Sequence, residues 1–462
     1  MDGKDVMNNI CPLDYRYGRE EMRAVFGETS RLQHQMDVEA ALARAHAFVG
    51  TIPQADADEI TRVANLDVVS IDRVKEIEKE TRHDVMAMVK AMTEKCRGDA
   101  GRFVHYGATS NDIVDTATAL QIREALDLIE GGVDNLMLTF AKLAKRERDT
   151  LEIGRTHAQF AIPITFGFKI AGYAQEMLRH KKRIQELRPR VCVGKMSGAV
   201  GTGAALGNRF FKVQEAVMKD LGLSFEPAAT QVVGRDRYTE LICLLGNIAT
   251  SMERYGTEVR NLQRSEIAEA AEPFDQEKQV GSSTMAHKRN PMMSENVCGL
   301  ARIVRSMIMP TFESQVLWHE RDLSNSSTER FALPHAFVLL DEMLYKTDWV
   351  FSGLTVNRER MIRNIESSQG LVMAEALMMR MTDKGMGRQD AHELIREASM
   401  TAMDDGRQLR DVVIEMTASN NITIMTEAEI RDAMDPAKYT GGAAEIVNMT
   451  VSEVEAVLNR KV

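Results

Sequence analysis

Apolar residues recur at alternating spacings of three and four along two long stretches of the chain. In the first stretch these positions are Ile122, Leu126, Ile129, Val133, Leu136, Phe140 and Leu143. In the second they are Tyr238, Leu241, Leu245, Ile248, Met252, Tyr255, Val259 and Leu262. This spacing is typical of long helices that pack against other helices. The pair Gly131-Gly132 interrupts the first stretch and is expected to bend or loosen its helix.

A third long helix is expected to begin after Asn290-Pro291. Its apolar positions are Val297, Leu300 and Val304, and Pro310 is expected to kink or break it. The helical pattern then resumes over residues 334–353. Long helices separated by turns favour a bundle at the centre of the chain.

The segments on either side of this bundle read as shorter helices and turns. The sequence therefore predicts an all-α protein with three domains. We expect an N-terminal helical domain at residues 1–109, a central long-helix bundle at 110–356 and a C-terminal helical domain at 357–462.

The charge balance argues against a nucleic-acid-binding protein. Among 462 residues, 58 are Lys or Arg and 68 are Asp or Glu, which gives a formal net charge of −10. A chain that binds phosphate backbones normally carries a basic patch, and none is seen here. No apolar run approaches the length of a membrane span or of a signal peptide, so we expect a cytoplasmic protein with no membrane contact.

The five cysteines are scattered and show no paired spacing. They lie at Cys11, Cys96, Cys192, Cys243 and Cys298. Zinc sites and redox motifs need closely spaced cysteines, so we expect reduced core thiols.

The glycine-rich segment Val193–Asn208 does not match a nucleotide-binding loop. Met196 follows Lys195 where a P-loop requires Ser or Thr, and the glycines from Gly201 to Gly207 miss the dinucleotide spacing. A turn or short hairpin between long helices is the better interpretation.

Polar residues gather most densely in Gly281–Glu295, with the sequence GSSTMAHKRNPMMSE. Lys288 and Arg289 lie near the expected start of a helix, where backbone N–H groups also attract anions. Such a segment suits an anionic substrate, although its composition fits a solvated surface loop equally well.

Four further polar clusters each contain a histidine. They are Thr81–Val85 (TRHDV), His105–Asp112 (HYGATSND), Gly154–Gln159 (GRTHAQ) and Trp318–Arg330 (WHERDLSNSSTER). A single histidine is more often structural than catalytic, but five of the ten histidines fall in these four clusters and in Gly281–Glu295. The H-E-x-x-H pattern of zinc enzymes and the G-x-S-x-G pattern of serine hydrolases are both missing.

Taken together, these motifs resemble a known enzyme family. GSSTMAHKRNP is similar to the shared loop of the fumarase/aspartase superfamily. The four histidine-bearing clusters, GKMSGAVGT and the opening Pro12–Gly18 (PLDYRYG) are similar to the adenylosuccinate lyase family. The chain departs from the family pattern at Ala286, where proline is usual, and at Phe160, where some relatives carry a second histidine.

The resemblance implies an enzyme that eliminates fumarate from adenylosuccinate and from SAICAR, with no metal and no cofactor. It implies a fumarase/aspartase-like fold whose central helices assemble a homotetramer. It also implies that each active site takes residues from three subunits, and that the partner molecule is a small succinylated purine nucleotide.

By resemblance, five residues take part in the chemistry. Ser283 is expected to be the general base and His157 the general acid. Lys288 is expected to stabilise the charge that develops on the carboxylate, His83 to orient the acid or contact the phosphate, and Glu295 to pair with His157.

The same resemblance assigns the residues that bind the substrate. Phosphate binding is expected at Arg16, Tyr17, Arg321, Ser326 and Arg330. The remaining substrate contacts are expected at His105, Thr109, Ser110, Gln231, Ser282 and Asn290, and Ser282 is also the alternative base.

Other interpretations lead to different experiments. Argininosuccinate lyase, fumarase and carboxymuconate cycloisomerase share the loop but not the TRHDV and WHERD pair. A helical scaffold without activity would keep the bundle and lose turnover, which the intact Ser283, Lys288, His157 and His83 argue against.

Overall fold

The computed structural model describes residues 10–274, 285 and 287–462, and most of them lie in helices. The chain divides into two compact units, each made of several stretches of sequence. The first contains residues 1–133, 180–253 and 297–345, and the second contains 134–179, 254–296 and 346–462.

Both stretches with helical spacing are long helices, as predicted. They belong to α7 (Ser110–Arg146) and α10 (Asp236–Leu262), and every residue of the two patterns is buried. Helix α7 continues through Gly131 and Gly132. A Cβ at Gly132 would lie 3.1 Å from Leu344, so this glycine allows a close approach to a neighbouring helix.

The third helix ends three residues earlier than Pro310 suggested. Helix α11 (Met292–Ser306) stops at Ser306, and α12 (Ile308–Glu313) follows with Pro310 in its first turn. A proline is tolerated there because its missing N–H has no helical acceptor. Helix α13 (Ser324–Ser352) begins ten residues before the predicted segment and includes Pro334.

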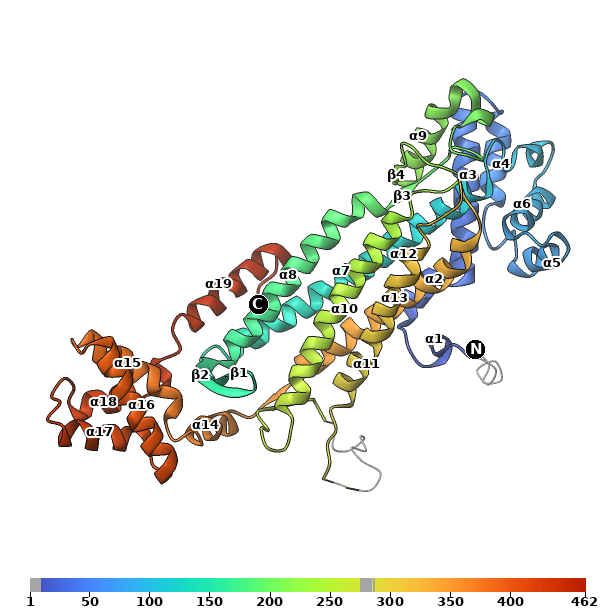
Figure 1. Ribbon diagram of the computed structural model, residues 1–462. Coiled ribbons are helices and arrows are strands. Elements are labelled where there is room, and N and C mark those ends of the chain that lie inside the picture. Colours follow the sequence, from blue (N-terminus) through green and yellow to red (C-terminus); the bar gives the residue numbers. More distant parts are fainter. Residues whose placement is uncertain (1–9, 275–284, 286) are drawn as a thin grey trace. The chain divides into compact units, whose positions relative to one another are not determined.

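In the first unit, shorter helices pack around the start of α7. These helices are α1 (Pro12–Tyr15), α2 (Glu20–Phe26), α3 (Glu28–Phe48), α4 (Gln54–Val63), α5 (Ile71–Thr81), α6 (Asp84–Lys95) and α9 (Phe210–Leu221), with 3₁₀ turns at Ala100–Phe103 and Ala204–Arg209. Helix α3 contacts both α4 and α9, and α5 contacts α6 (Figure 1). Met36, Ile60, Met88 and Ile113 lie in their common apolar core.

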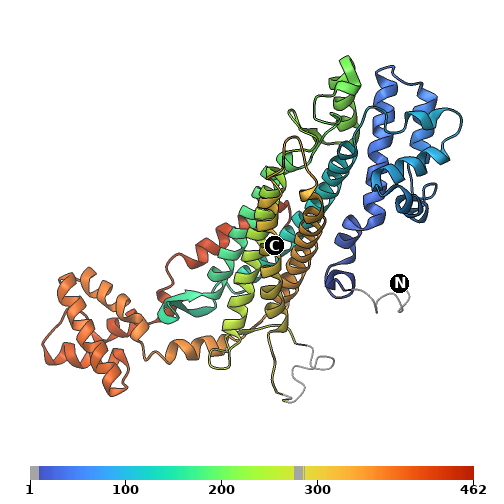
Figure 2. The same ribbon diagram turned by 45° about the vertical axis from the view of Figure 1, so that its right-hand side comes forward.

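The second unit holds a two-stranded hairpin and the C-terminal helices. The hairpin pairs β1 (Leu151–Thr156) with β2 (Gln159–Thr165) in antiparallel register, and α8 (Phe166–Val191) follows it. The remaining elements are β5 (Ala270–Ala271), β6 (Thr355–Val356), α14 (Arg358–Glu366), a 3₁₀ turn (Leu371–Met373), α15 (Ala374–Asp383), α16 (Arg388–Asp405), α17 (Leu409–Ser419), α18 (Glu427–Ala433), a 3₁₀ turn (Pro436–Lys438) and α19 (Ala443–Leu458). Helices α15 to α18 gather around a core of their own, as Figures 1 and 2 both show.

Four aromatic rings join the long helices inside the second unit. Phe140, Tyr173, Tyr255 and Phe351 come from α7, α8, α10 and α13, and their ring centroids lie 4.5 to 6.4 Å apart. All four rings are buried, and most of these contacts are edge-to-face, which aromatic rings favour. The cluster therefore fixes how these helices pack in this unit.

No helix among the described residues is long and apolar enough to cross a membrane. All five cysteines carry free thiols, but only Cys298 is buried. The expectation of core thiols is wrong for the other four, which are partly exposed.

Replacing Phe140 with alanine is expected to destabilise the protein by about 3–5 kcal/mol, because the fully buried ring meets three other aromatic rings. Urea unfolding followed by circular dichroism measures the change. The control is Phe211→Ala, whose side chain is 72% exposed and whose loss is expected to change stability by less than about 0.5 kcal/mol. Equal losses for the two variants would contradict this account of the core.

Candidate active site

One buried carboxylate, Asp112, holds the first turn of α7. It accepts hydrogen bonds from the Thr109 N–H at 2.8 Å, the Ser197 N–H at 2.9 Å and the Gly198 N–H at 3.0 Å. It also pairs with the Lys195 ammonium at 2.5 Å, and both side chains of this pair are fully buried. Thr109 and Ser110 are therefore fixed at the N-terminus of a 37-residue helix, which is a natural site for an anion.

The glycine-rich segment Val193–Asn208 packs around this carboxylate. Its strand β3 (Val193–Gly194) pairs in parallel with β4 (Ser224–Phe225), so the segment is a loop and not a hairpin. A Cβ at Gly194 would lie 2.9 Å from Thr116, on α7, and only glycine permits this approach. The glycines here serve close packing.

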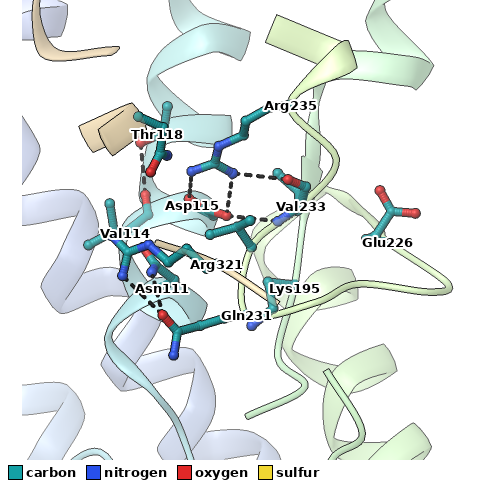
Figure 3. Close-up of polar contacts among 12 residues, drawn as sticks. Asn111, Val114, Asp115, Thr118, Lys195, Glu226, Gln231, Val233, Arg235 and Arg321 are labelled. Atoms are coloured by element: carbon teal, nitrogen blue, oxygen red, sulfur yellow. Dashed lines mark hydrogen bonds and ion pairs between the residues drawn. The ribbon is translucent and has the colours of Figure 1, made fainter. Parts of the chain in front are cut away.

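Gln231 connects α7 to the segment before α13 (Figure 3). Its side-chain oxygen accepts a hydrogen bond from Arg321 at 3.0 Å and a longer one from Asn111 at 3.5 Å. Its amide nitrogen donates to the Ala199 carbonyl at 3.0 Å. Three motifs that lie far apart in the sequence therefore meet at this amide.

A buried ion pair lies behind this contact. Asp115 accepts two hydrogen bonds from the Arg235 guanidinium, at 2.8 and 2.9 Å, and a third from the Val233 N–H at 2.9 Å (Figure 3). Arg235 also pairs with Glu329 of α13 at 2.8 Å. Burial raises the pKa of Glu329, although Arg235 opposes the shift.

Arg321 carries donor capacity that these contacts do not use. Its Nε is buried and has no hydrogen-bond partner among the described residues. Burial, reinforced by the charge of Arg235, lowers the pKa of Arg321 from its ordinary value. Asp115, Glu329 and Asp322 oppose this shift, and an anion would supply the acceptor that Nε lacks.

His83 caps α6 and contacts the start of α7. Its Nδ1 accepts the Met86 N–H at 3.3 Å, so the neutral ring carries its proton on Nε2. That Nε2 lies 3.3 Å from the Ser110 hydroxyl. The ring is therefore held in one orientation with an N–H facing the helix terminus.

The neighbouring Asp84 brings Arg330 of α13 to the same place. It pairs with Arg330 at 2.9 Å and with Arg31 at 3.4 Å. Burial alone raises the pKa of Asp84, but the Val85 N–H and the two arginines outweigh it and lower that pKa. Asp84 thus stays ionised and holds Arg330 close to His83.

One network of contacts in the first unit therefore includes six of the residues predicted from the sequence. They are His83, Thr109, Ser110, Gln231, Arg321 and Arg330. Ser326 lies one helical turn before Arg330 on α13. Arg16 and Tyr17 follow α1, and in the described part of the chain no hydrogen bond links Arg16 to the network.

His105 makes a separate contact with a buried glutamate. Its Nδ1 lies 2.6 Å from Glu39, which also accepts the His105 backbone N–H at 2.9 Å. Burial opposes protonation of the ring, but the hydrogen bond and charge of Glu39 outweigh it and raise the pKa of His105. These two contacts hold His105 in a left-handed backbone conformation, with a φ of +65°, which is strained for a residue other than glycine.

In the second unit, His157 lies at the tip of the β1–β2 hairpin. Thr156 pairs with Gln159, so His157 and Ala158 form a two-residue loop. Their φ values are +53° and +61°, as a type I′ turn requires, although neither residue is glycine. Each costs on the order of 1–2 kcal/mol in this conformation. The His157 side chain is exposed, ready to meet another molecule.

Charged side chains surround the base of this hairpin. Arg155 forms two hydrogen bonds to Glu269, at 2.7 and 2.8 Å. Lys169 pairs with Glu152 at 2.7 Å and with Glu258 at 2.6 Å. Burial raises the pKa of Glu152 to about 7, while Lys169 opposes the shift.

A cleft of about 880 Å³ opens beside the hairpin in the second unit. The residues before and after His157, Thr156 and Ala158, line this cleft. Arg155, Lys169 and Arg254 line it as well. A second groove, of about 1090 Å³, lies between α3 and α9 in the first unit and contains none of the predicted site residues.

The polar segment Gly281–Glu295 is described only in part. Ser282 and Ser283 lie outside the described residues. Lys288 is exposed, Asn290 is half-buried, and Glu295 is exposed in the first turn of α11. Among the residues that the structure describes, no hydrogen bond or ion pair joins Glu295 to His157, so their expected pairing stays a prediction.

Sequence reasoning missed the residues that support these side chains. Arg155 and Asp112 lie inside motifs that were noticed, GRTHAQ and HYGATSND, but no role was assigned to them. Their partners Glu269 and Lys195 are 114 and 83 residues away. Lys195 lies in the motif GKMSGAVGT, but no local pattern links it to Asp112, and none marks Glu269.

The chain matches two family models. The model described as "Lyase" matches residues 14–306, and the model described as "Adenylosuccinate lyase C-terminus" matches residues 370–450.

Relatives and solved structures agree with these matches. The adenylosuccinate lyase of Pyrococcus abyssi is 49% identical over 98% of this chain and 99% of its own length, and that of Methanothermobacter thermautotrophicus is 45% identical over 96% and 98%. Among solved structures, a fumarate lyase from Mesorhizobium sp. BNC1 is 31% identical with a TM-score of 0.85, covering 94% of this chain and 97% of its own. The 3-carboxy-cis,cis-muconate lactonizing enzyme of Pseudomonas putida is 33% identical with a TM-score of 0.87, covering 97% and 100%.

The helical fold and these matches define a lyase of the fumarase/aspartase superfamily. Within that class, the chain belongs to the adenylosuccinate lyase family.

Glu152→Gln is expected to change how stability depends on pH. Folded Glu152 holds its proton up to about pH 7, whereas the unfolded residue releases it near 4.5. The wild type therefore loses stability at this site as the pH rises between these values. The variant lacks this loss, so its stability relative to wild type should improve by ~2–3 kcal/mol between pH ~5 and pH ~8. Urea midpoints at the two pH values measure this, and parallel pH profiles for the two proteins would contradict it.

Proposed function

We propose that this protein cleaves adenylosuccinate to AMP and fumarate, and SAICAR to AICAR and fumarate, by β-elimination. Membership of the adenylosuccinate lyase family carries this conclusion. The unused Nε–H donor of Arg321 in the first unit also supports this function. Arg321 belongs to the same network of contacts as the N-terminus of α7, and the two together suit a ligand with several anionic groups.

We assign the phosphate to Arg16, Tyr17, Arg321, Ser326 and Arg330. The forked guanidinium groups of arginine match phosphate oxygens in geometry and charge. The buried, unpartnered Nε of Arg321 supports this assignment. In the free protein Asp84 pairs with Arg330. The phosphate of the ligand would then compete with Asp84 for this arginine.

We assign the succinyl carboxylates to the start of α7. Thr109 and Ser110 lie at a helix N-terminus, where backbone dipoles favour negative charge. Gln231 and His105 are assigned to the rest of the ligand. The Nε2–H of His83 points at Ser110, which places a donor beside the same carboxylate or the phosphate.

Removal of the proton is the difficult step, because the carbon lies beside a carboxylate and is a very weak acid. The second charge that develops on that carboxylate needs preorganised cations and donors. We assign this stabilisation to Lys288 and Asn290, with Ser283 as the base and Ser282 as a substrate contact. A serine hydroxyl is a poor base in water, so its activation requires that water be excluded from the site.

Protonation of the departing nitrogen completes the elimination. We assign it to His157, because imidazole is the side chain most often used to donate and accept protons at neutral pH. Its exposed position at a strained turn supports this role, since strained residues gather at functional sites. Glu295 is the proposed partner that keeps the ring protonated.

A homotetramer with shared active sites is part of the proposal. Large apolar side chains are exposed on α12, on the start of α13 and on the segment between them in the first unit, namely Met309, Phe312, Val316, Trp318, Leu323 and Phe331. Exposed apolar surface of this extent marks an interaction site, and like subunits commonly cover it by symmetry. His83 and His157 belong to different units, and association of subunits would let both serve one ligand. The chemistry needs no metal or cofactor, and its purine nucleotide substrates place the enzyme in the cytoplasm.

Ser283→Ala and His157→Asn are each expected to slow turnover by at least ~10²-fold, because each removes a proton-transfer group. Asparagine suits the left-handed backbone at position 157 better than alanine does. Fumarate release from adenylosuccinate measures the rate, with argininosuccinate and malate as control substrates.

Ser282→Ala is the matched control for the base, and its turnover is expected to stay within about tenfold of wild type. If Ser283→Ala kept near-normal turnover while Ser282→Ala lost it, the base would be Ser282. Full turnover by both variants would remove a serine base from the mechanism.

Arg321→Met is expected to raise KM by ~10–100-fold and to change kcat much less, because a lost charge-assisted contact weakens binding of the ligand throughout the reaction. The variant should also lose the preference of the wild type for phosphorylated over dephosphorylated substrate. Arg62→Met, which removes a pairing with Glu59 on α4, is the control and should leave both constants unchanged. An unchanged preference for phosphate in Arg321→Met would contradict the assignment.

A further inference from the structure

The hairpin alone does not stabilise the turn that carries His157. Two-stranded hairpins are only marginally stable in water, and this one has two non-glycine residues with positive φ at its tip. The pairing register also shifts between Ile153 and Arg155, which loosens the ladder two residues before the tip. Contacts outside the hairpin must therefore fix the position of His157.

Arg155 supplies the nearest such contact. It lies two residues before His157, and its guanidinium forms a bidentate pair with Glu269 at 2.7 and 2.8 Å. Across the hairpin it faces Phe160, its cross-strand partner, with the guanidinium 5.4 Å from the ring centroid. A planar, two-point contact fixes orientation as well as distance.

Glu269 is itself immobilised. Its side chain is fully buried and accepts a further hydrogen bond from Asn364 of α14 at 2.7 Å. Its backbone N–H donates to Leu262 at 3.0 Å, and its carbonyl accepts from Asn357 at 2.8 Å. Arg155 is therefore tied to a rigid point that joins the end of α10 to α14.

The charge at this point is balanced only while Arg155 is present. Without it, the Glu269 carboxylate keeps the amide of Asn364 as its remaining side-chain partner. The nearby Glu152 lies 4.0 Å from Arg155 and pairs mainly with Lys169. Loss of Arg155 would leave a buried carboxylate without its cation, and the hairpin would move to admit water.

We propose that Arg155, paired with Glu269, is a positioning residue that holds the His157 turn in the geometry required to protonate the departing nitrogen. This inference rests on the proposed role of His157 as the general acid. Arg155 acts through His157 and does not itself exchange a proton with the substrate. A displacement of about 1 Å at such a group slows the chemical step by on the order of 10²-fold.

A kinetic double-mutant cycle tests the proposal in the full-length enzyme. Arg155→Met is expected to lower kcat by ~10–100-fold and to change KM by less than about threefold. In a His157→Asn background the same substitution should cost nothing further, because there is no acid left to misplace. Arg155→Lys keeps the charge but loses the two-point contact, and should recover part of the lost kcat.

The matched control is Arg358→Met, which breaks a bidentate arginine pair with buried Glu147 in the same unit. If that pair serves stability alone, its substitution should lower the melting temperature without lowering kcat at the assay temperature. If Arg155→Met prevents folding, Glu269→Gln replaces it in the cycle, because the amide keeps the shape and removes the charge.

Each outcome bears on the proposal. Losses that multiply in the double variant would show that Arg155 acts independently of His157 and would overturn it. A rise in KM at constant kcat would make Arg155 a binding residue and would also overturn it. Full activity of His157→Asn alone would refute the proposed acid, which is a failure of the proposed function and is visible without any Arg155 variant.

Discussion

The position of the α7 N-terminus depends on the buried carboxylate of Asp112. A fully buried ion pair is costly to desolvate, and it is tolerated here because backbone N–H groups and the Lys195 ammonium satisfy both carboxylate oxygens. The same contacts set the path of the glycine-rich loop and the start of a 37-residue helix. Ser110, His83, Gln231 and Arg321 lie in the network of contacts around this turn.

In the second unit the corresponding buried carboxylate is Glu269. It accepts hydrogen bonds from an arginine and from a neutral amide, and it fixes the hairpin that carries His157. In each unit a buried carboxylate fixes a segment that carries residues proposed to contact the ligand, with Asp112 holding Thr109 and Glu269 holding the hairpin of His157 through Arg155. The Arg321 Nε–H has no acceptor among the described residues and the His157 side chain is exposed, so both keep polar groups for a ligand. The proposed mechanism needs this arrangement, because a donor that is already paired cannot stabilise charge that develops during the reaction.

The sequence was most informative where chemistry and periodicity are local. The apolar spacing over Ile122–Leu143 and Tyr238–Leu262 predicted two buried helices correctly, since helix geometry repeats within a few residues. It misplaced the start of α13 by ten residues, because the polar run Ser324–Arg330 reads as a loop although it is helical. The motifs contain His83, Ser110, Arg321 and Arg330, and the family resemblance added Gln231; the structure joins all five in one network. The roles of Lys195 and Glu269 could not be predicted, because tertiary folding alone brings them to Asp112 and Arg155.

The proposed mechanism requires that one ligand contact both the polar network around Ser110 and a His157 turn. A crystal structure of the Ser283→Ala enzyme with bound adenylosuccinate tests it most directly. The account predicts Arg321 on the phosphate, Ser110 on a succinyl carboxylate, and a His157 ring nitrogen, supplied by whichever subunit, within ~3.2 Å of the nitrogen that departs. A fully occupied ligand on the first network, with every His157 too far away for a proton to pass directly or through one water, would contradict it.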